Sequence, residues 1–336
     1  MRFCKTTLWI KKSPSDFNDM ALTSFGRFRS AKPGSATGFR ARWAESARFV
    51  QAALAAALAI AGPAAAADWS PSHIVVVIEE NHAFEQIIGN PDAPFINKLA
   101  AEGALFTDAH GITHPSQPNY LALFSGSTQN TAGDRTVRGT PLGTPNLGAA
   151  LIAKGYSFAG YCEDLPEVGS LKSSARGGYA RKHNPWSNWQ AADPGANQLA
   201  AHTNQPFKNF PSDFTRLPTV AFVVPNLYND QHGDGFTSDR TLIRDSDDWL
   251  KSNIGAYAQW AVTHDSLLIV TWDEDDNDDS PLNHIATIMV GARVKPGRYD
   301  QRIDHYGVLR MIEHFYGLPH AGASAGAAPI VGVVRE

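Results

Sequence analysis

Short apolar runs alternate with amphipathic segments along most of the chain, and this alternation predicts the fold class. Most of the runs are rich in β-branched residues, as is typical of strands that are buried on both faces. The apolar runs cover residues 72–78, 157–161, 219–224, 266–272 and 285–290. The helical patterns cover residues 93–102, 147–154, 245–260 and 306–316. Strands that alternate with helices predict an α/β fold, with a mainly parallel central sheet and helices on both faces.

A long segment without a clear period interrupts this alternation. Residues 163–212 are rich in Gly, Asn, Pro, Ser and Trp, and we expect them to form an irregular excursion from the same domain. Such an excursion can cover a site, and its aromatic side chains could contact a lipid headgroup. These aromatic residues are Trp186, Trp189 and Phe207.

Residues 1–67 have the features of a leader that contains a signal peptide. Three arginines precede an Ala-rich apolar run at residues 49–60, and the alanines at residues 64–67 precede Asp68. A charged flank, a short apolar core and small residues at the cut are the parts of a signal peptide. The apolar run is too short for a stable membrane span. We therefore expect an exported protein whose single domain covers residues 68–336.

Removal of the leader would leave a strongly acidic protein. The leader contains 10 of the 29 Lys and Arg residues and 3 of the 33 Asp and Glu residues, so the remaining net charge is about −11. This charge argues against binding to nucleic acid or to an anionic membrane surface. Of the two cysteines only Cys162 lies after the leader, which excludes a disulfide framework within the domain.

Residues 113–120 place a serine between two prolines at the start of a predicted helix. Proline favours extended or first-turn geometry, so the helix should begin near Ser116, with Asn119 in its first turn. A helix N-terminus presents free backbone N–H groups and a positive dipole end, which attract an anion. Ser116 is therefore a candidate nucleophile toward a phosphate, although a serine at this position is also a common helix N-cap.

Polar residues with metal-binding side chains follow three of the apolar runs. Glu80 and Asn81 come after the first run, residues 226–232 after another, and Asp273 and Glu274 after a third. Ligands bind at the carboxyl ends of strands in parallel sheets, so these segments should meet at one edge. Their hard oxygen ligands suit Mg²⁺, Ca²⁺ or Mn²⁺, or Zn²⁺ in a carboxylate-rich site.

The acidic run that begins at Asp273 does not fit an EF-hand loop. Its sixth position is Asp278 where glycine is required, and its twelfth is His284 where glutamate is required. We expect the outer acids, residues 275–279, to form a solvated loop. The acidity leaves open a second function class, a secreted Ca²⁺-dependent binding protein, but that class does not explain Ser116 and its loop.

Taken in order, the motifs of the chain resemble those of the bacterial acid phosphatase and phospholipase C-type phosphoesterases of the alkaline-phosphatase superfamily. The resemblance covers most of residues 72–320. Its motifs are Glu80-Asn81-His82, residues 114–120, residues 225–232, Trp272-Asp273-Glu274, Asn283-His284 and residues 305–310. The superfamily order is an acid, a hydroxyl nucleophile, an Asp/His pair, a metal-binding doublet and a late histidine, and the fold implied is alkaline-phosphatase-like.

The resemblance implies a metal-dependent hydrolase that forms a covalent phosphoserine at Ser116. It implies that Asn119 and Asp230 bind the substrate. Three histidines would hold phosphate oxygens or protonate the leaving group, and these are His232, His305 and His284. The implied metal ligands are Glu80, Asn81, Ser116, Asp273 and Glu274.

Two differences from the two-zinc members of the superfamily limit the number of metals. The doublet is Asp273-Glu274, where those members have Asp-His. One residue separates Asp230 from His232, where those members have three. We therefore expect one divalent metal ion. As substrates we expect phosphate monoesters of small molecules or lipid headgroups in preference to the diesters of a phospholipase C, because a basic amphipathic helix is missing from the sequence.

Overall fold

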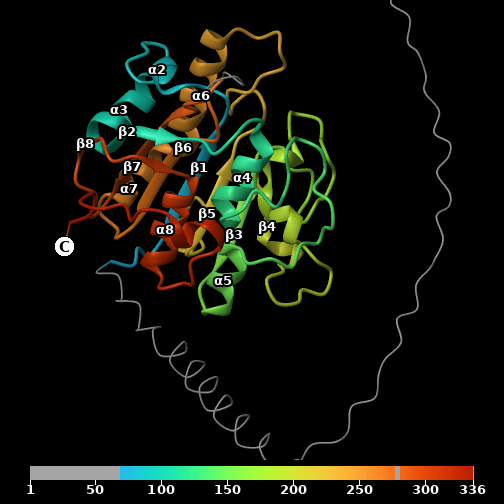
Figure 1. The fold of residues 1–336 in the computed structure, drawn as a ribbon. Coiled ribbons are helices and arrows are strands. Elements are labelled where there is room, and N and C mark those ends of the chain that lie inside the picture. The colour runs from blue at the N-terminus through green and yellow to red at the C-terminus, as the bar shows by residue number, and fades with distance from the viewer. Residues whose placement is uncertain (1–68, 277–280, 336) are drawn as a thin grey trace, which may run out of the picture. The chain divides into compact units, whose positions relative to one another are not determined.

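A nine-stranded sheet forms the centre of the protein (Figure 1). The computed structural model describes residues 69–276 and 281–335, so the predicted leader lies outside the described residues. The strands are β1 (Ile74–Glu79), β2 (Ala104–His110), β3 (Phe158–Cys162), β4 (Asn204–Pro206), β5 (Val220–Val224), β6 (Leu267–Trp272), β7 (His284–Gly291), β8 (Gly297–Tyr299) and β9 (Ile303–Asp304). Their order is β4-β3-β5-β1-β6-β7-β2-β8, and β9 pairs with β2.

The central strands are apolar because helices cover both of their faces. Every residue of β1, β5 and β6 is buried, and β1 lies parallel to the other two. Full burial of one Val, Ile or Leu side chain contributes about 1.5–3 kcal/mol, so these runs supply much of the stability. Within the described residues β7 alone runs against its neighbours, antiparallel to β6 and β2. The expected mainly parallel sheet is thus confirmed.

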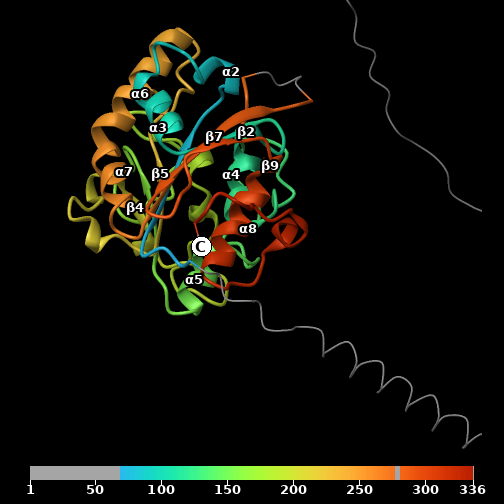
Figure 2. The same ribbon diagram turned by 90° about the vertical axis from the view of Figure 1, so that its left-hand side faces the viewer.

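Helices lie on both faces of the sheet, as the sequence predicted. The helices are α2 (Phe84–Ile87), α3 (Pro94–Glu102), α4 (Ser116–Ser125), α5 (Leu147–Ala153), α6 (Asp239–Asn253), α7 (Gly255–Ala261) and α8 (His305–Phe315). Figure 2 shows α3, α6 and α7 on one side of the strands and α4 and α8 on the other. The single helix expected over residues 245–260 is two helices, and the first begins at Asp239 because Ser238 accepts a hydrogen bond from the Thr241 N–H as its N-cap.

Strand β2 was not predicted, because its sequence contains no continuous apolar run. Thr107 and Asp108 are only partly buried, since β2 lies between β7 and the short strands β8 and β9 near one edge of the sheet. Its carboxyl end nevertheless matters for the site. The chain leaves β2 at His110 and enters α4 at Ser116.

The irregular segment at residues 163–212 packs into the core instead of covering a site with its tryptophans. Trp186 and Trp189 are fully buried, and both rings contact Phe124 of α4. Gly160 of β3 makes room for Trp186, because a Cβ atom at this glycine would lie 2.0 Å from the indole ring. The expectation that these two tryptophans could contact a ligand is therefore wrong. Phe207 is partly buried and stacks on Phe210.

The carboxyl ends of β1, β2, β5 and β6 meet at one edge of the sheet. Their parallel relation follows from the observed pairings, with β2 reached through the reversed strand β7. Because the chain enters α4 from β2, this edge also receives Ser116. The described residues include no helix that is long and apolar enough to cross a membrane.

Candidate active site

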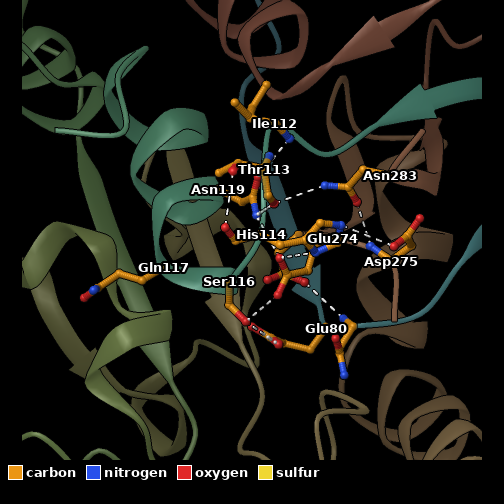
Figure 3. A network of polar contacts seen from close by, with 12 residues as sticks. Glu80, Ile112, Thr113, His114, Ser116, Gln117, Asn119, Glu274, Asp275 and Asn283 are labelled. Carbon is orange, nitrogen blue, oxygen red and sulfur yellow. Dashed lines mark hydrogen bonds and ion pairs between the residues drawn. The ribbon is translucent and has the colours of Figure 1, made fainter. Parts of the chain in front are cut away.

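The hydroxyl of Ser116 lies between two carboxylates at the first residue of α4 (Figure 3). Its Oγ is 3.1 Å from Glu80 Oε2 and 3.0 Å from Glu274 Oε1, and its single proton can be donated to one of them at a time. The N-cap position belongs to Pro115, which has an extended backbone. Ser116 is therefore not the N-cap, and its hydroxyl contacts the two carboxylates instead of capping α4.

An acidic cluster surrounds this hydroxyl, and we define it as Glu80, Asp273 and Glu274. The three carboxylates are buried, and they place oxygen atoms within 4.8 Å of one another. One oxygen of Asp273 accepts the backbone N–H of Asn81 at 3.0 Å, while the other has no hydrogen-bond partner among the described residues. Burial and the charges of Glu80 and Glu274 raise the pKa of Asp273 well above its usual range. Such a cluster of repelling oxygens has the chemistry of a cation site.

The amide of Asn119 holds the loop that precedes Ser116. Its Oδ1 accepts the backbone N–H groups of Ile112 and Thr113, at 2.8 and 3.1 Å. Its Nδ2 donates to the Thr113 carbonyl at 2.7 Å and to Glu274 Oε2 at 3.3 Å. Asn119 thus ties the loop to the acidic cluster. The role in substrate binding that the resemblance implies for this residue stays a prediction.

His114 joins the acidic cluster to Asp275. Its Nδ1 is 2.9 Å from Glu274 Oε2, and its Nε2 is 3.4 Å from Asp275 Oδ1. Asp275 is buried, and its other oxygen accepts the backbone N–H of His284 at 3.1 Å. The expectation that Asp275 lies in a solvated loop is therefore wrong. Of the remaining outer acids, Asp276 is exposed and residues 277–280 lie outside the described residues.

On the other side of Glu80 lies a basic cluster, which we define as Lys182, His183 and His232. His183 bridges two carboxylates, with Nε2 2.7 Å from Glu80 Oε1 and Nδ1 3.1 Å from Asp230 Oδ2. Burial disfavours its charged form, but these two carboxylates outweigh burial and raise the pKa of His183 to about 9. Burial likewise opposes ionisation of Glu80, yet the charges of His183 and Lys182 hold the pKa of this carboxyl well below its usual range.

Lys182 and His232 are held by a chain of contacts that leads back to the nucleophile. The Lys182 ammonium is 3.0 Å from His232 Nε2 and 2.8 Å from Asp134 Oδ2. An ammonium only donates, so Nε2 accepts, and the Nδ1–H of His232 is left to donate to the Gly233 carbonyl at 3.1 Å. Asp134 Oδ1 accepts the backbone N–H of Gln117 at 3.1 Å, so this carboxylate occupies the helix N-terminus that was expected to attract an anion.

Lys182, His183 and Asp134 are site residues that were not predicted from the sequence. The signal available for the first two was the run of three basic residues at 181–183, inside a segment that was expected to cover a site. Asp134 lies in a polar loop after α4 and carries no comparable signal. All three residues reach the site from segments without a regular period, so periodicity could not place them.

The other two predicted histidines support strand ends. His305 is buried, and its Nε2 is 2.7 Å from the carbonyl oxygen of Asp273. Burial lowers the pKa of His305, which favours its uncharged form. His284 contacts the Glu85 carboxylate at 3.0 Å and the Thr107 carbonyl at 3.1 Å. His305 thus contacts the backbone of a member of the acidic cluster, and His284 contacts α2 and β2. Their catalytic roles stay predictions.

Comparison with known families agrees with this geometry. Residues 90–319 match the phosphoesterase family. The chain belongs to the phosphoesterase family. This phosphoesterase is 47% identical over 275 residues to a phosphatidylinositol-3-phosphatase of Mycobacterium tuberculosis, which covers 81% of the chain and 86% of the relative. It is 29% identical over 274 residues to a probable acid phosphatase of Kluyveromyces lactis, covering 78% of the chain and 62% of that relative.

Solved structures support the expected alkaline-phosphatase-like fold. The phosphoesterase superposes on a protein of the alkaline phosphatase superfamily from Vibrio parahaemolyticus with a TM-score of 0.55 and 14% identity, covering 78% of this chain and 71% of that one. The lipoteichoic acid synthase LtaP from Listeria monocytogenes gives 0.50 and 11%, covering 75% and 73%. The fold class is thus confirmed. Family membership identifies the protein as a hydrolase of phosphoric esters. The alternative function, a secreted Ca²⁺-dependent binding protein, is therefore not supported.

Proposed function

We propose that this phosphoesterase is an exported, metal-dependent enzyme that hydrolyses phosphate monoesters through a covalent phosphoserine at Ser116. One observation carries the proposal: the hydroxyl of Ser116 lies at the start of a buried helix, within hydrogen-bond distance of Glu80 and Glu274. A serine in this position has carboxylates to accept its proton and faces the carboxyl edge of the sheet, where ligands bind in α/β folds.

The residues around Ser116 fit one divalent metal ion. The acidic cluster supplies hard oxygens, and Asp273 keeps one buried oxygen without a hydrogen-bond partner among the described residues. We propose that Asn81 and Ser116 complete the ligand set, with Ca²⁺, Mg²⁺, Mn²⁺ or Zn²⁺ as candidates. When bound, the ion would lower the pKa of the serine and neutralise phosphoryl charge. A second group, Glu80, His183 and His232, also places possible metal ligands close together. We propose a single ion because the Lys182 ammonium lies 3.0 Å from His232 Nε2 and brings a positive charge to this second group.

The proposed reaction has two steps. In the first, Ser116 Oγ attacks the phosphorus while its proton passes to Glu274. The bond from phosphorus to the ester oxygen breaks, and this oxygen takes up a proton from Glu274 or water and leaves as the alcohol. In the second, water hydrolyses the phosphoserine, which releases inorganic phosphate and restores the hydroxyl. The basic cluster lies on the other side of Glu80 and can stabilise the negative phosphoryl oxygens during both steps.

The name of one relative supports the preference for monoesters. As its name says, a phosphatidylinositol-3-phosphatase hydrolyses a phosphate monoester on a lipid headgroup, and that relative shares 47% identity with this chain over 275 residues. We propose a phosphorylated small molecule or a lipid headgroup as the substrate. The leader pattern in residues 1–67 supports export, with maturation near Asp68.

Hydrolysis of an aryl phosphate by the protein from Asp68 onward tests this function. We expect turnover that disappears with EDTA, returns with a divalent ion, and falls by about 10³-fold or more in Ser116→Ala. Ser125→Ala is the matched control, because Ser125 is buried in the same helix and donates to the Leu121 carbonyl. Undiminished turnover in Ser116→Ala rules out the phosphoserine. Faster release of diacylglycerol from phosphatidylcholine would favour the phospholipase C alternative.

A further inference from the structure

Lys182 has a mostly buried side chain and lies outside the sequence motifs that resemble the family. Its side chain is 18% exposed, and two of its three N–H donors have acceptors, Asp134 and His232. Glu80, Asp134 and Asp273 outweigh the effect of burial and raise the pKa of Lys182, so the group is a fixed positive charge. This charge acts on two members of the acidic cluster without forming an ion pair with either.

The supports of Lys182 fix its position relative to the nucleophile. Asp134 accepts a hydrogen bond from the ammonium through Oδ2 and from the Gln117 N–H through Oδ1. Gln117 directly follows Ser116, so a single carboxylate connects the ammonium to the backbone at the nucleophile. The side chain of Gln117 also fixes the loop that carries Asp134. Its Nε2 donates to the Gly133 and Arg135 carbonyls on either side of Asp134, at 2.8 and 2.7 Å.

His232 supports Lys182 from a second direction. Because its Nε2 accepts a hydrogen bond from the ammonium, this nitrogen is not available as a donor to a phosphoryl oxygen in the arrangement observed. Lys182 keeps a third N–H for which the described residues provide no acceptor. Enzymes with two metal ions stabilise both the attacking and the leaving oxygen with metal charge, and in an enzyme with one ion a lysine can supply the second positive charge.

We propose that Lys182 is a catalytic residue that donates its remaining N–H to a phosphoryl oxygen of the substrate at Ser116, in place of a second metal ion. The proposal rests on the function proposed above. Asp134 and His232 are then positioning residues that hold the ammonium between the helix start and the loop after β5. The charge matters most as the phosphoryl group leaves its alcohol, because negative charge on its oxygens is then stabilised by a donor already in place.

The test compares Lys182→Met, Lys182→Arg and Lys172→Met. The last is the matched control, because Lys172 lies exposed in the same irregular segment. Two quantities are measured for each protein: kcat and KM for an aryl phosphate, and the affinity for inorganic phosphate by titration calorimetry. Calorimetry uses the divalent ion that supports the highest turnover, or Ca²⁺ if none supports turnover.

We expect Lys182→Met to lower kcat/KM by about 10²–10³-fold and phosphate affinity by at least about tenfold. Lys182→Arg, which keeps the charge, should recover at least about tenfold of the lost kcat/KM, whereas Lys172→Met should stay within about twofold of the unchanged protein. Retention of both kcat/KM and phosphate affinity within about threefold in Lys182→Met would overturn the proposal, as would an arginine variant no better than the methionine variant.

Asp134→Asn provides a second variant that keeps the ammonium. We expect it to lower kcat with little change in thermal unfolding temperature, because Asn still accepts the Gln117 N–H but holds Lys182 less firmly. A rise in phosphate affinity in this variant would instead show that Asp134 competes with phosphate, and would overturn its positioning role. If the unchanged protein binds phosphate but does not hydrolyse esters, the proposed function fails, while loss of phosphate binding in Lys182→Met still supports the lysine contact. If it does neither, both proposals fail.

Discussion

The basic cluster contacts the acidic cluster at Glu80, but the fold positions the two clusters in different ways. The acidic side chains follow directly on β1 and β6, so hydrogen bonds between parallel strands fix their backbones. The basic side chains come from residues 181–183 and from the loop after β5. Contacts to carboxylates hold Lys182 and His183, and Lys182 in turn contacts His232. The sheet thus presents negative charge at a rigid edge, and a loop-rich segment brings positive charge to it.

This difference has an energetic consequence. The basic cluster is compensated by the protein itself, because His183 contacts Glu80 and Asp230 while Lys182 contacts Asp134. The acidic cluster retains a buried oxygen of Asp273 with no hydrogen-bond partner among the described residues. Buried charges are stable only when they are paired or when they bind a metal. We therefore expect substitutions in the acidic cluster to affect chiefly metal binding and turnover, and substitutions in the basic cluster to affect also the stability of the fold.

Glu274→Gln should have the largest effect on turnover. It removes the charge from a carboxylate that contacts Ser116, His114 and Asn119, and so weakens both the proposed metal site and the proton acceptor. We expect kcat/KM for an aryl phosphate to fall by about 10³-fold or more, with metal affinity by calorimetry falling in parallel. Glu102→Gln is the control, because this carboxylate is exposed at the end of α3. Turnover within tenfold of the unchanged protein would argue against the acidic cluster as the metal site.

His183→Ala should have the largest effect on stability. The change leaves Glu80 and Asp230 buried without their shared cation, and loss of one partner from a buried ion pair costs about 3–5 kcal/mol. Urea unfolding of the metal-free protein measures this loss as a lower free energy of unfolding. His264→Ala is the control, because His264 is exposed. A loss below about 1 kcal/mol would show that the two clusters do not differ in the way described.

The acidic cluster could be predicted from the sequence, because each of its members follows an apolar run. The runs before Glu80 and Asp273 are long enough to identify buried strands, and parallel strands bring their carboxyl ends together whatever lies between them. The position of Ser116 also followed from local signals, since the flanking prolines mark the start of a helix. These inferences needed only the order of the elements and the direction of the strands.

The basic cluster could not be predicted in the same way. His183 lies in a short 3-10 helix, and its position depends on the burial of Trp186 and on contacts with residues 47 and 103 positions away in the sequence, Asp230 and Glu80. Strand β2 was missed for a related reason, because its pairing with β7 comes from tertiary structure and its own sequence lacks an apolar run. Features that depend on distant partners leave little trace in local periodicity.

Glu313→Gln should have the smallest effect on activity. It tests whether the pH dependence of the free energy of unfolding is independent of the pH dependence of turnover. Glu313 is buried in α8, where it accepts hydrogen bonds from Ser324 Oγ and the Ala321 N–H. Burial outweighs these contacts and raises the pKa of Glu313 to about 7. Since the folded protein favours the protonated carboxyl, this contribution to stability is complete below about pH 4.5 and is lost as the pH rises through about 7.

Glutamine stays uncharged, so Glu313→Gln should be about as stable as the unchanged protein at pH 4.5 and more stable by about 2 kcal/mol at pH 8. Urea unfolding across this range measures the difference, and kcat/KM measured alongside should not change, because Glu313 contacts neither cluster. A variant that is less stable than the unchanged protein at pH 8 would mean that the ionised carboxylate is stabilised by its two hydrogen bonds. If the variant changed the pH dependence of kcat/KM, the effect would have to reach the site by a movement of α8. The first residue of this helix, His305, contacts the backbone carbonyl of Asp273.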